Sequence, residues 1–423
     1  MVQLSRTNNI SLSGDQTSVD ASQLAESVKT GNDINRNVRV GSKAMDKYDN
    51  SVIGKNVSIG FENQFFNSNG IQNVSIGNEC LKGIELYNGS NFNVAIGYQC
   101  GENIGDNSIN NVLIGYKCSK ASLSNKFIGD NNTYIGFQCG LVNTSGSENV
   151  GIGTNCLDSN TSGSQNVAIG KECLQSNVTG SFNVSMGYQS LYSNTASNNT
   201  AIGYKCSYFN SSGQYNTAIG YKCLEGETNV YTGTNNNVAI GFQCGQFIGD
   251  GANSNVLIGY ECGKAATGSG EFIGDNNTYI GFQCGLLSTV ANSNVAIGYQ
   301  CLKNSTDSQN SVIIGRDCFN GFTTDPRPNY TGSQLNSSFQ GLKSRQNVFI
   351  GVECSQFYVR NKFEGFSNVH NVVIGYRAAK FVNYMTNSVI IGDHAGGGFN
   401  EANSGGDSTP HSNVGMDNVA IGG

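Results

Sequence analysis

Residues 166–187 read NVAIGKECLQSNVTGSFNVSMG and contain two copies of a five-residue motif, Asn-Val-Ala-Ile-Gly and Asn-Val-Ser-Met-Gly. The motif recurs from about residue 37 to the end of the chain. Over Gly136, Gly153, Gly170, Gly187, Gly203 and Gly220 its glycine returns after 17, 17, 17, 16 and 17 residues, while the step elsewhere reaches up to 36 residues. A fixed motif with variable insertions is typical of a solenoid.

The two faces of the motif differ. Val and Ile are two residues apart and therefore share one face of a short strand, while the residue between them points to the other face. From Asn56 onward this middle position carries no charge, although a sheet face in water would carry charged residues. We therefore expect Val and Ile to line the inside of the coil, and the middle residues to contact another copy of the chain. The contact residues expected are Ala168, Ala201, Ala218 and Ala296.

The asparagine and the glycine of the motif have separate expected roles. Asparagine stands four residues before the glycine in nearly every copy, as at Asn73, Asn93 and Asn166. Stacked Asn side chains can hydrogen-bond to one another from coil to coil. The glycine is expected to supply a positive φ or a close backbone approach where the strand turns.

Cysteine occurs only three residues after a motif glycine, and Ser190, Ala378 and Ala395 take this place in other copies. A small buried side chain is therefore expected there, in a packed column of thiols. The fourteen positions are Cys80, Cys100, Cys118, Cys139, Cys156, Cys173, Cys206, Cys223, Cys244, Cys262, Cys284, Cys301, Cys318 and Cys354.

The thiols are predicted to be reduced. Adjacent coils about 4.8 Å apart would allow a disulfide by distance, but in-register parallel side chains fit the required torsion poorly. Reduced thiols indicate assembly in a reducing cytosol. No Cys or His pairs have metal-ligand spacing, so we predict no metal and no cofactor. Asp106, Asp130, Asp250 and Asp275 in repeated IGD turns leave a Ca²⁺ site as an alternative to ordinary Asx turns.

The hexapeptide helix of acyltransferases is an alternative solenoid with a similar coil length. It needs aliphatic residues on three faces, whereas the tract after each Cys-Leu is rich in Ser, Asn, Gly and Thr. The sequence therefore favours a coil with one apolar strand and its return.

The stretches TGSFNVSMGYQSLYSNTASNNTAIGYKC (179–206) and NSSGQYNTAIGYKCL (210–224) resemble the NxAIGxxAL repeats of the β-roll head in YadA-like trimeric autotransporter adhesins. They also resemble related arrays in phage and large-virus fibre proteins. The resemblance implies an all-β, left-handed parallel β-roll or β-solenoid, here of about 20 coils, and a homotrimer. It further implies a non-enzymatic stalk or head that projects from a particle or cell surface.

Two departures from these repeats matter. Cys replaces the usual Ala or Ser, and the sequence shows neither an export signal nor a C-terminal membrane anchor. Both favour a fibre assembled inside a host cell and displayed on a virion. Many such fibres end in a self-cleaving trimerisation chaperone, and because this sequence ends within a motif, at NVAIGG (418–423), a removed segment of that kind is one expectation.

The sequence divides into three parts: a non-repetitive cap or anchor at 1–36, with a short helix expected around 20–30; regular repeats at 37–318; and repeats with long inserted loops at 319–423. Long loops on a rigid scaffold are common binding sites. Aromatic and cationic side chains in the insertions are candidate contacts to a host glycan or protein receptor, although packing of these loops on the roll is the alternative. These candidates are Phe322, Tyr330, Phe339, Tyr358, Phe363 and Arg360.

Composition narrows the function classes. A net charge of −6 without a basic cluster gives no nucleic-acid footprint, and no apolar window is long enough for a membrane span. No arrangement of nucleophile, base and orienting residue is visible. We therefore predict a structural attachment protein rather than an enzyme, with partners limited to its own copies, a host receptor and a particle or capsid anchor. A tailspike-like glycan hydrolase with paired carboxylates remains the alternative, and an ice-binding solenoid is disfavoured because the insertions interrupt a regular Thr array.

Overall fold

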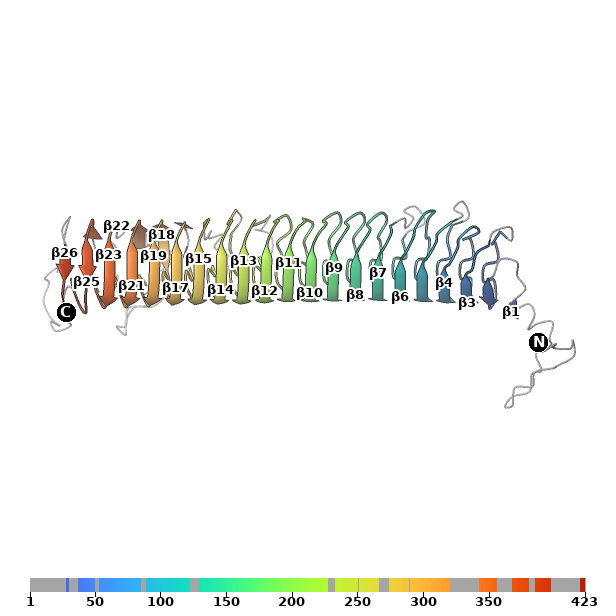
Figure 1. Cartoon of the computed structure of the whole chain (residues 1–423), viewed down its shortest axis with the longest axis horizontal. Coiled ribbons are helices and arrows are strands. Elements are labelled where there is room, and N and C mark those ends of the chain that lie inside the picture. The colour runs from blue at the N-terminus through green and yellow to red at the C-terminus, as the bar shows by residue number, and fades with distance from the viewer. Residues whose placement is uncertain are drawn as a thin grey trace, which may run out of the picture. The chain divides into compact units, whose positions relative to one another are not determined.

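The computed structural model describes residues 28–29, 37–49, 53–84, 89–121, 129–226, 233–249, 251–265, 274–288, 290–319, 342–355, 367–379, 385–396 and 419–422. In these residues every regular element is a β-strand. The chain forms two compact units, residues 1–189 and residues 190–423. Within each unit the chain is a parallel β-solenoid, with strands of successive coils side by side (Figure 1). The predicted all-β solenoid is therefore confirmed.

The first unit is built on one parallel ladder in which β2 to β10 pair in chain order. β1 pairs antiparallel with β2, so the expected helix around 20–30 is wrong at Val28 and Lys29. The strands are β1 (Val28–Lys29), β2 (Val38–Val40), β3 (Val57–Phe61), β4 (Val74–Asn78), β5 (Val94–Tyr98), β6 (Val112–Tyr116), β7 (Thr133–Phe137), β8 (Val150–Thr154), β9 (Val167–Lys171) and β10 (Val184–Tyr188).

The second unit has a main ladder and a second, shorter parallel sheet. The main ladder contains β11 (Thr200–Tyr204), β12 (Thr217–Tyr221), β13 (Val238–Phe242), β14 (Val256–Tyr260), β15 (Thr278–Phe282), β17 (Val295–Tyr299), β19 (Val312–Arg316), β21 (Val348–Val352), β23 (Val372–Tyr376), β25 (Val389–Ile391) and β26 (Val419–Ile421). The second sheet contains β16 (Val290–Asn292), β18 (Ser305–Gln309), β20 (Leu342–Arg345), β22 (Ser367–Val369) and β24 (Met385–Thr386).

Register follows the motif, because like residues pair with like: Ala201 with Ala218, and Gly203 with Gly220. The expectation for the glycine is confirmed on both counts. Gly203 has a φ of 130°, and a Cβ at this position would overlap the carbonyl oxygen of Gly220 in the next coil. Only glycine fits that combination.

Our expectation of which strand face lies inside the coil is wrong. The middle residues Ala168, Ala201, Ala218 and Ala296 are fully buried inside a single chain. The Val or Thr and the Ile on either side are partly exposed, as the pattern of β11 and β12 shows. The four alanines therefore cannot form a contact between copies. The alternation located the two faces correctly but could not tell which one the returning chain covers.

The core is thin, and its side chains are complementary in size. Ala296 is accompanied by Leu302, four residues after the motif glycine of the same coil. Where the middle residue is Tyr279, the equivalent of that leucine is Gly285, and a Cβ there would overlap the Tyr279 ring. At Tyr279 the large residue on the strand is thus matched by a glycine on the return.

Candidate functional site

The cysteine column lies inside the solenoid, next to the glycine turns. All fourteen cysteines are free and buried. The Sγ of Cys173 is 3.3 Å from the carbonyl oxygen of Ile169 in its own coil and 3.1 Å from that of Gly187 in the next. The same two contacts recur at Cys223, with Ile219 and Gly241. In these coils the thiol therefore donates to a backbone carbonyl and links one coil to the next.

Ser190 and Asn63 make the same contact where cysteine is missing, whereas Ala378 and Ala395 have no donor group. The Ser190 hydroxyl donates to Gly203 O at 2.8 Å. Asn63, three residues after Gly60, donates through Nδ2 to Ile59 O at 2.7 Å and to Gly77 O at 3.0 Å. Sequence reasoning treated this place only as small, and the presence of Ser and Asn was the signal that a hydrogen-bond donor is favoured there.

The surroundings of Cys156 oppose ionisation of its thiol. Hydrogen bonding with Cys139 and burial raise the pKa of the Cys156 thiol to about 12. A thiolate beside carbonyl oxygens would lose the donated hydrogen bond and would be poorly solvated. The geometry is that of structural thiols rather than of nucleophiles.

The predicted asparagine ladder is confirmed. Oδ1 of Asn166 accepts the backbone N–H of Asn183 at 3.0 Å and its side-chain Nδ2 at 3.1 Å. Nδ2 of Asn166 donates to Asn149 Oδ1 at 3.1 Å and to Gly180 O at 2.9 Å. In the second unit the ladder runs through Asn216 and Asn237 in the same way. Each amide satisfies buried polar groups of two neighbouring coils.

The outward face of the main ladder presents the same residue types in successive coils. In every coil from β3 to β10 of the first unit, and from β11 to β23 of the second, the first and third strand positions are partly or fully exposed. These positions carry Val or Thr and Ile, with Met186 as the exception. We call these two columns the Val/Ile face. Contiguous exposed apolar surface of this kind marks interaction sites.

An aromatic ladder borders this face at the fifth strand position. In the second unit the rings stack in order from Tyr204 to Tyr299, with centroids 4.9–5.2 Å apart. The Arg316 guanidinium lies over the last ring, 5.5 Å from its centroid. In the first unit the stack contains Tyr98, Tyr116 and Phe137.

Charged and amide side chains form a row on the turns that follow the strands. Lys82 Nζ lies 2.8 Å from carboxylate oxygens of both Glu62 and Glu79, and Gln99 donates to Glu79 at 2.6 Å. Hydrogen bonds from Lys82 and Lys43 hold the pKa of Glu62 below its ordinary value, and Lys82 does the same for Glu79. These groups stabilise the turns and pair with one another.

The IGD turns act as backbone acceptors between coils. Asp106 Oδ1 accepts the N–H of Gly89 at 3.0 Å, Asp130 Oδ1 that of Ile109 at 2.9 Å, and Asp275 Oδ1 that of Asn253 at 2.7 Å. Asp250 lies outside the described residues. These hydrogen bonds give the three described carboxylates a role in the turns. Among the described residues, no cluster of three or more Cys, His, Asp or Glu side chains has metal-binding geometry.

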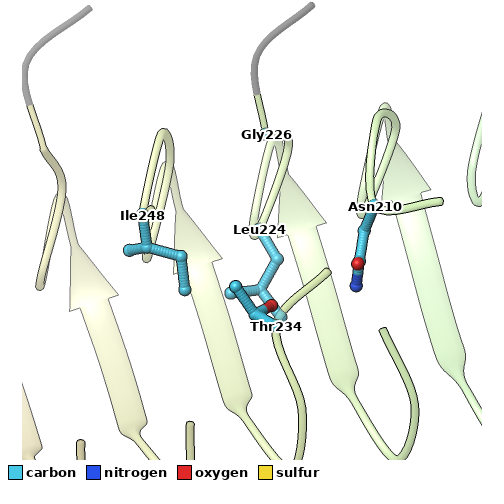
Figure 2. A pocket seen from close by; sticks show the side chains of 5 residues that line it. All are labelled: Asn210, Leu224, Gly226, Thr234 and Ile248. Atoms are coloured by element: carbon cyan, nitrogen blue, oxygen red, sulfur yellow. The ribbon is translucent and has the colours of Figure 1, made fainter. Parts of the chain in front are cut away.

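The six candidate receptor residues, Phe322, Tyr330, Phe339, Tyr358, Arg360 and Phe363, lie outside the described residues. A small pocket in the second unit is lined by Asn210, Leu224, Gly226, Thr234 and Ile248 (Figure 2). Its volume is about 10 Å³, which fits about one water molecule. Sites for small organic ligands are far larger.

Across the described part of the chain, no helix has the length and apolar character needed to cross a membrane. Comparison of the chain with protein-family models, with curated proteins and with solved structures gave no match.

Proposed function

We propose that this chain is a non-enzymatic structural protein that assembles as a homotrimer through its Val/Ile face. The assembly projects from a virion or particle surface and mediates attachment to a host surface. The observation that carries the proposal is the Val/Ile face itself, which repeats in successive coils and is partly exposed in the single chain.

Self-association is the simplest way to cover that face. Its columns are uniform along each unit, so copies of the same chain offer matching surfaces in matching register. Burying apolar surface contributes roughly 25 cal/mol per Å², and the repetition multiplies this gain over many coils. The number of three copies, the left-handed coil and about 20 coils come from the resemblance to the YadA-like repeats.

The thiols support the proposed place of assembly. Free buried cysteines fit assembly in a reducing cytosol before display on the particle. In this proposal residues 1–36 hold the chain on the particle or capsid, and the loops within 319–370 contact a host glycan or protein. No nucleic acid, cofactor or membrane span has a role in it.

The attachment step is tested by shortening residues 321–341 and 356–366 to the turn length of 157–165, which leaves β20 and β22 in place. Binding of labelled protein to a panel of cultured cells and to a printed glycan array is compared with that of the parent. A matched control shortens 227–232, an insertion in another coil. We expect the receptor-loop variant to lose binding, while its unfolding temperature and the binding of the control stay unchanged.

Two results would contradict attachment through these loops. One is a shortened variant that binds as well as the parent. The other is a parent that binds no cell and no glycan on either panel.

A further inference from the structure

Several tyrosines are stacked in pairs across adjacent coils. The ring centroids of Tyr98 and Tyr116 are 5.2 Å apart with an interplanar angle of 10°, and those of Tyr204 and Tyr221 are 5.2 Å apart at 8°. A third pair on the turns joins Tyr192 and Tyr208, at 4.8 Å and 14°. Each pair lies within one compact unit.

The backbone holds these rings together. Tyr98 and Tyr116 are register partners in the β5–β6 ladder, and Tyr204 and Tyr221 are register partners in the β11–β12 ladder. The third pair is fixed by the hydrogen bond from Ser193 N–H to Tyr208 O. Paired strands keep neighbouring backbones about 4.8 Å apart, so the two rings of a strand pair start from adjacent positions while the sheet is intact.

In the single chain the strand pairs are also within reach of small reagents. Tyr98 and Tyr204 are each 40% exposed, and their partners Tyr116 and Tyr221 are 37% and 38% exposed. The next ring in each stack is a phenylalanine, Phe137 or Phe242, which has no phenol to oxidise.

We propose that these three tyrosine pairs are sites of oxidative coupling, in which dityrosine bonds join successive coils of one chain. The co-reactant is a one-electron oxidant that acts twice. Each phenol gives up one electron and its hydroxyl proton, and the two radicals join through the ring carbons ortho to oxygen. The two ortho hydrogens then move to the oxygens and restore both phenols. The product has lost two protons and two electrons, which the oxidant accepts.

Such bonds would tie the solenoid along its axis. The links close chain segments between residues 18, 17 and 16 positions apart, about one coil each. A covalent link across a coil restricts the unfolded chain in the way a disulfide does. A particle fibre would thereby resist unravelling after it leaves the cell.

The test uses the assembled full-length protein, a photo-oxidised ruthenium tris(bipyridyl) complex as oxidant, and persulfate as electron acceptor. Peptide mass spectrometry identifies joined peptides that have lost two hydrogens. We expect links for the three pairs, with the cross-linked protein running as a single chain in a denaturing gel. The same treatment in denaturant should lose this pairing pattern.

Three variants make the test specific. Tyr116→Phe keeps the ring stack but should abolish the Tyr98 link. Tyr260→Phe is the matched control, because Tyr260 stacks between Phe242 and Phe282, and it should change nothing. Phe242→Tyr joins Tyr221 to Tyr260 through a new phenol and should create new links at that position.

The proposal is overturned if no dityrosine forms at these pairs in the folded protein. Links found only between chains, or the same links in folded and denatured protein, would overturn it equally. Because the readout does not depend on binding or on the number of copies, its failure is distinct from failure of the proposed function.

Discussion

Size matching within one coil makes the core of the solenoid sensitive to single residues. Gly285 has a φ of 63°, and Leu302 occupies the equivalent place in the next coil with a φ of 58°, so backbone conformation does not exclude leucine. The obstacle at Gly285 is the ring of Tyr279. The two residues therefore act as one packing pair.

We predict that Gly285→Leu overpacks the coil and costs about 1–3 kcal/mol of unfolding free energy. Tyr279→Ala alone should cost about 3–5 kcal/mol by leaving a cavity. The double variant recreates the Ala296 and Leu302 arrangement, and it should be more stable than the sum of the single changes allows. Denaturant unfolding measures the stability of the parent, the two single variants and the double variant. Strictly additive changes in unfolding free energy would show that the two residues are not coupled.

Hydrogen bonding by the cysteine column gives a second prediction. Cys173→Ser should be mild, because Ser190 already makes the equivalent bond to a glycine carbonyl. Cys173→Leu should cost about 1–3 kcal/mol by overpacking. Thermal unfolding compares the two variants, and thiol titration in denaturant without reductant should find the parent cysteines free. Serine as costly as leucine, or a thiol count near zero, would contradict this role for the column.

Alkaline pH should destabilise the fold. Hydrogen bonding with Cys139 and burial raise the pKa of Cys156 to about 12, and burial raises the pKa of Tyr134 and Tyr279. A group whose pKa is higher in the folded than in the unfolded protein stabilises the fold. That contribution is complete below the unfolded pKa, which is about 8.5 for Cys and about 10 for Tyr, and it is lost as pH rises through the folded pKa. Unfolding free energy should therefore fall between about pH 8 and about pH 12, and Tyr279→Phe should flatten the fall. A flat profile for the parent would contradict the burial of these groups.

At the level of the strand, the asparagine ladder joins each coil to the next. Asn166→Ala would remove the buried hydrogen bonds of the Asn166 side chain with the N–H and Nδ2 of Asn183, with Asn149 Oδ1 and with Gly180 O. Each such loss costs about 1–3 kcal/mol. The stability of Asn166→Ser should lie between that of the parent and that of Asn166→Ala, because a serine can replace part of the ladder: Ser311 Oγ accepts the N–H of Asn347 in the native protein.

Denaturant unfolding measures these variants against Gln165→Ala, whose side chain is exposed beside the same bend. We expect the order of stability to be control, serine, alanine. Alanine as stable as the control would mean that the ladder is not needed.

The strand pattern predicted much of this element from the sequence. Five-residue spacing within the motif predicted the strands, their parallel register, the Asn166 ladder and the glycine turn at Gly203. The face covered by the returning chain was not predictable, because Ala201 and Ile202 are both uncharged and the alternation is symmetric. The pairing of Tyr279 with Gly285 was visible in the sequence only once a coil was known to bring the two positions together. Ion pairs such as Lys82 with Glu62 depend on side-chain reach that spacing does not define.

Over the whole molecule, the proposed assembly depends on the outward Val/Ile face. Ile202 and Ile219 are register partners on this face, and both are partly exposed in the single chain. A carboxylate at these positions can remain in water in one free chain, but it would be buried and unpaired between copies. Removing such charges from water costs several kcal/mol each. Ser212→Glu with Gln214→Glu adds the same charges on an exposed turn and serves as the control.

Native mass spectrometry of the parent, of Ile202→Glu with Ile219→Glu, and of the control tests this claim most directly. Circular dichroism verifies that each chain keeps its β-structure. We predict three copies for the parent and the control, and single chains for the isoleucine variant. A parent that remains a single chain, or an isoleucine variant that stays trimeric, would contradict assembly through the Val/Ile face.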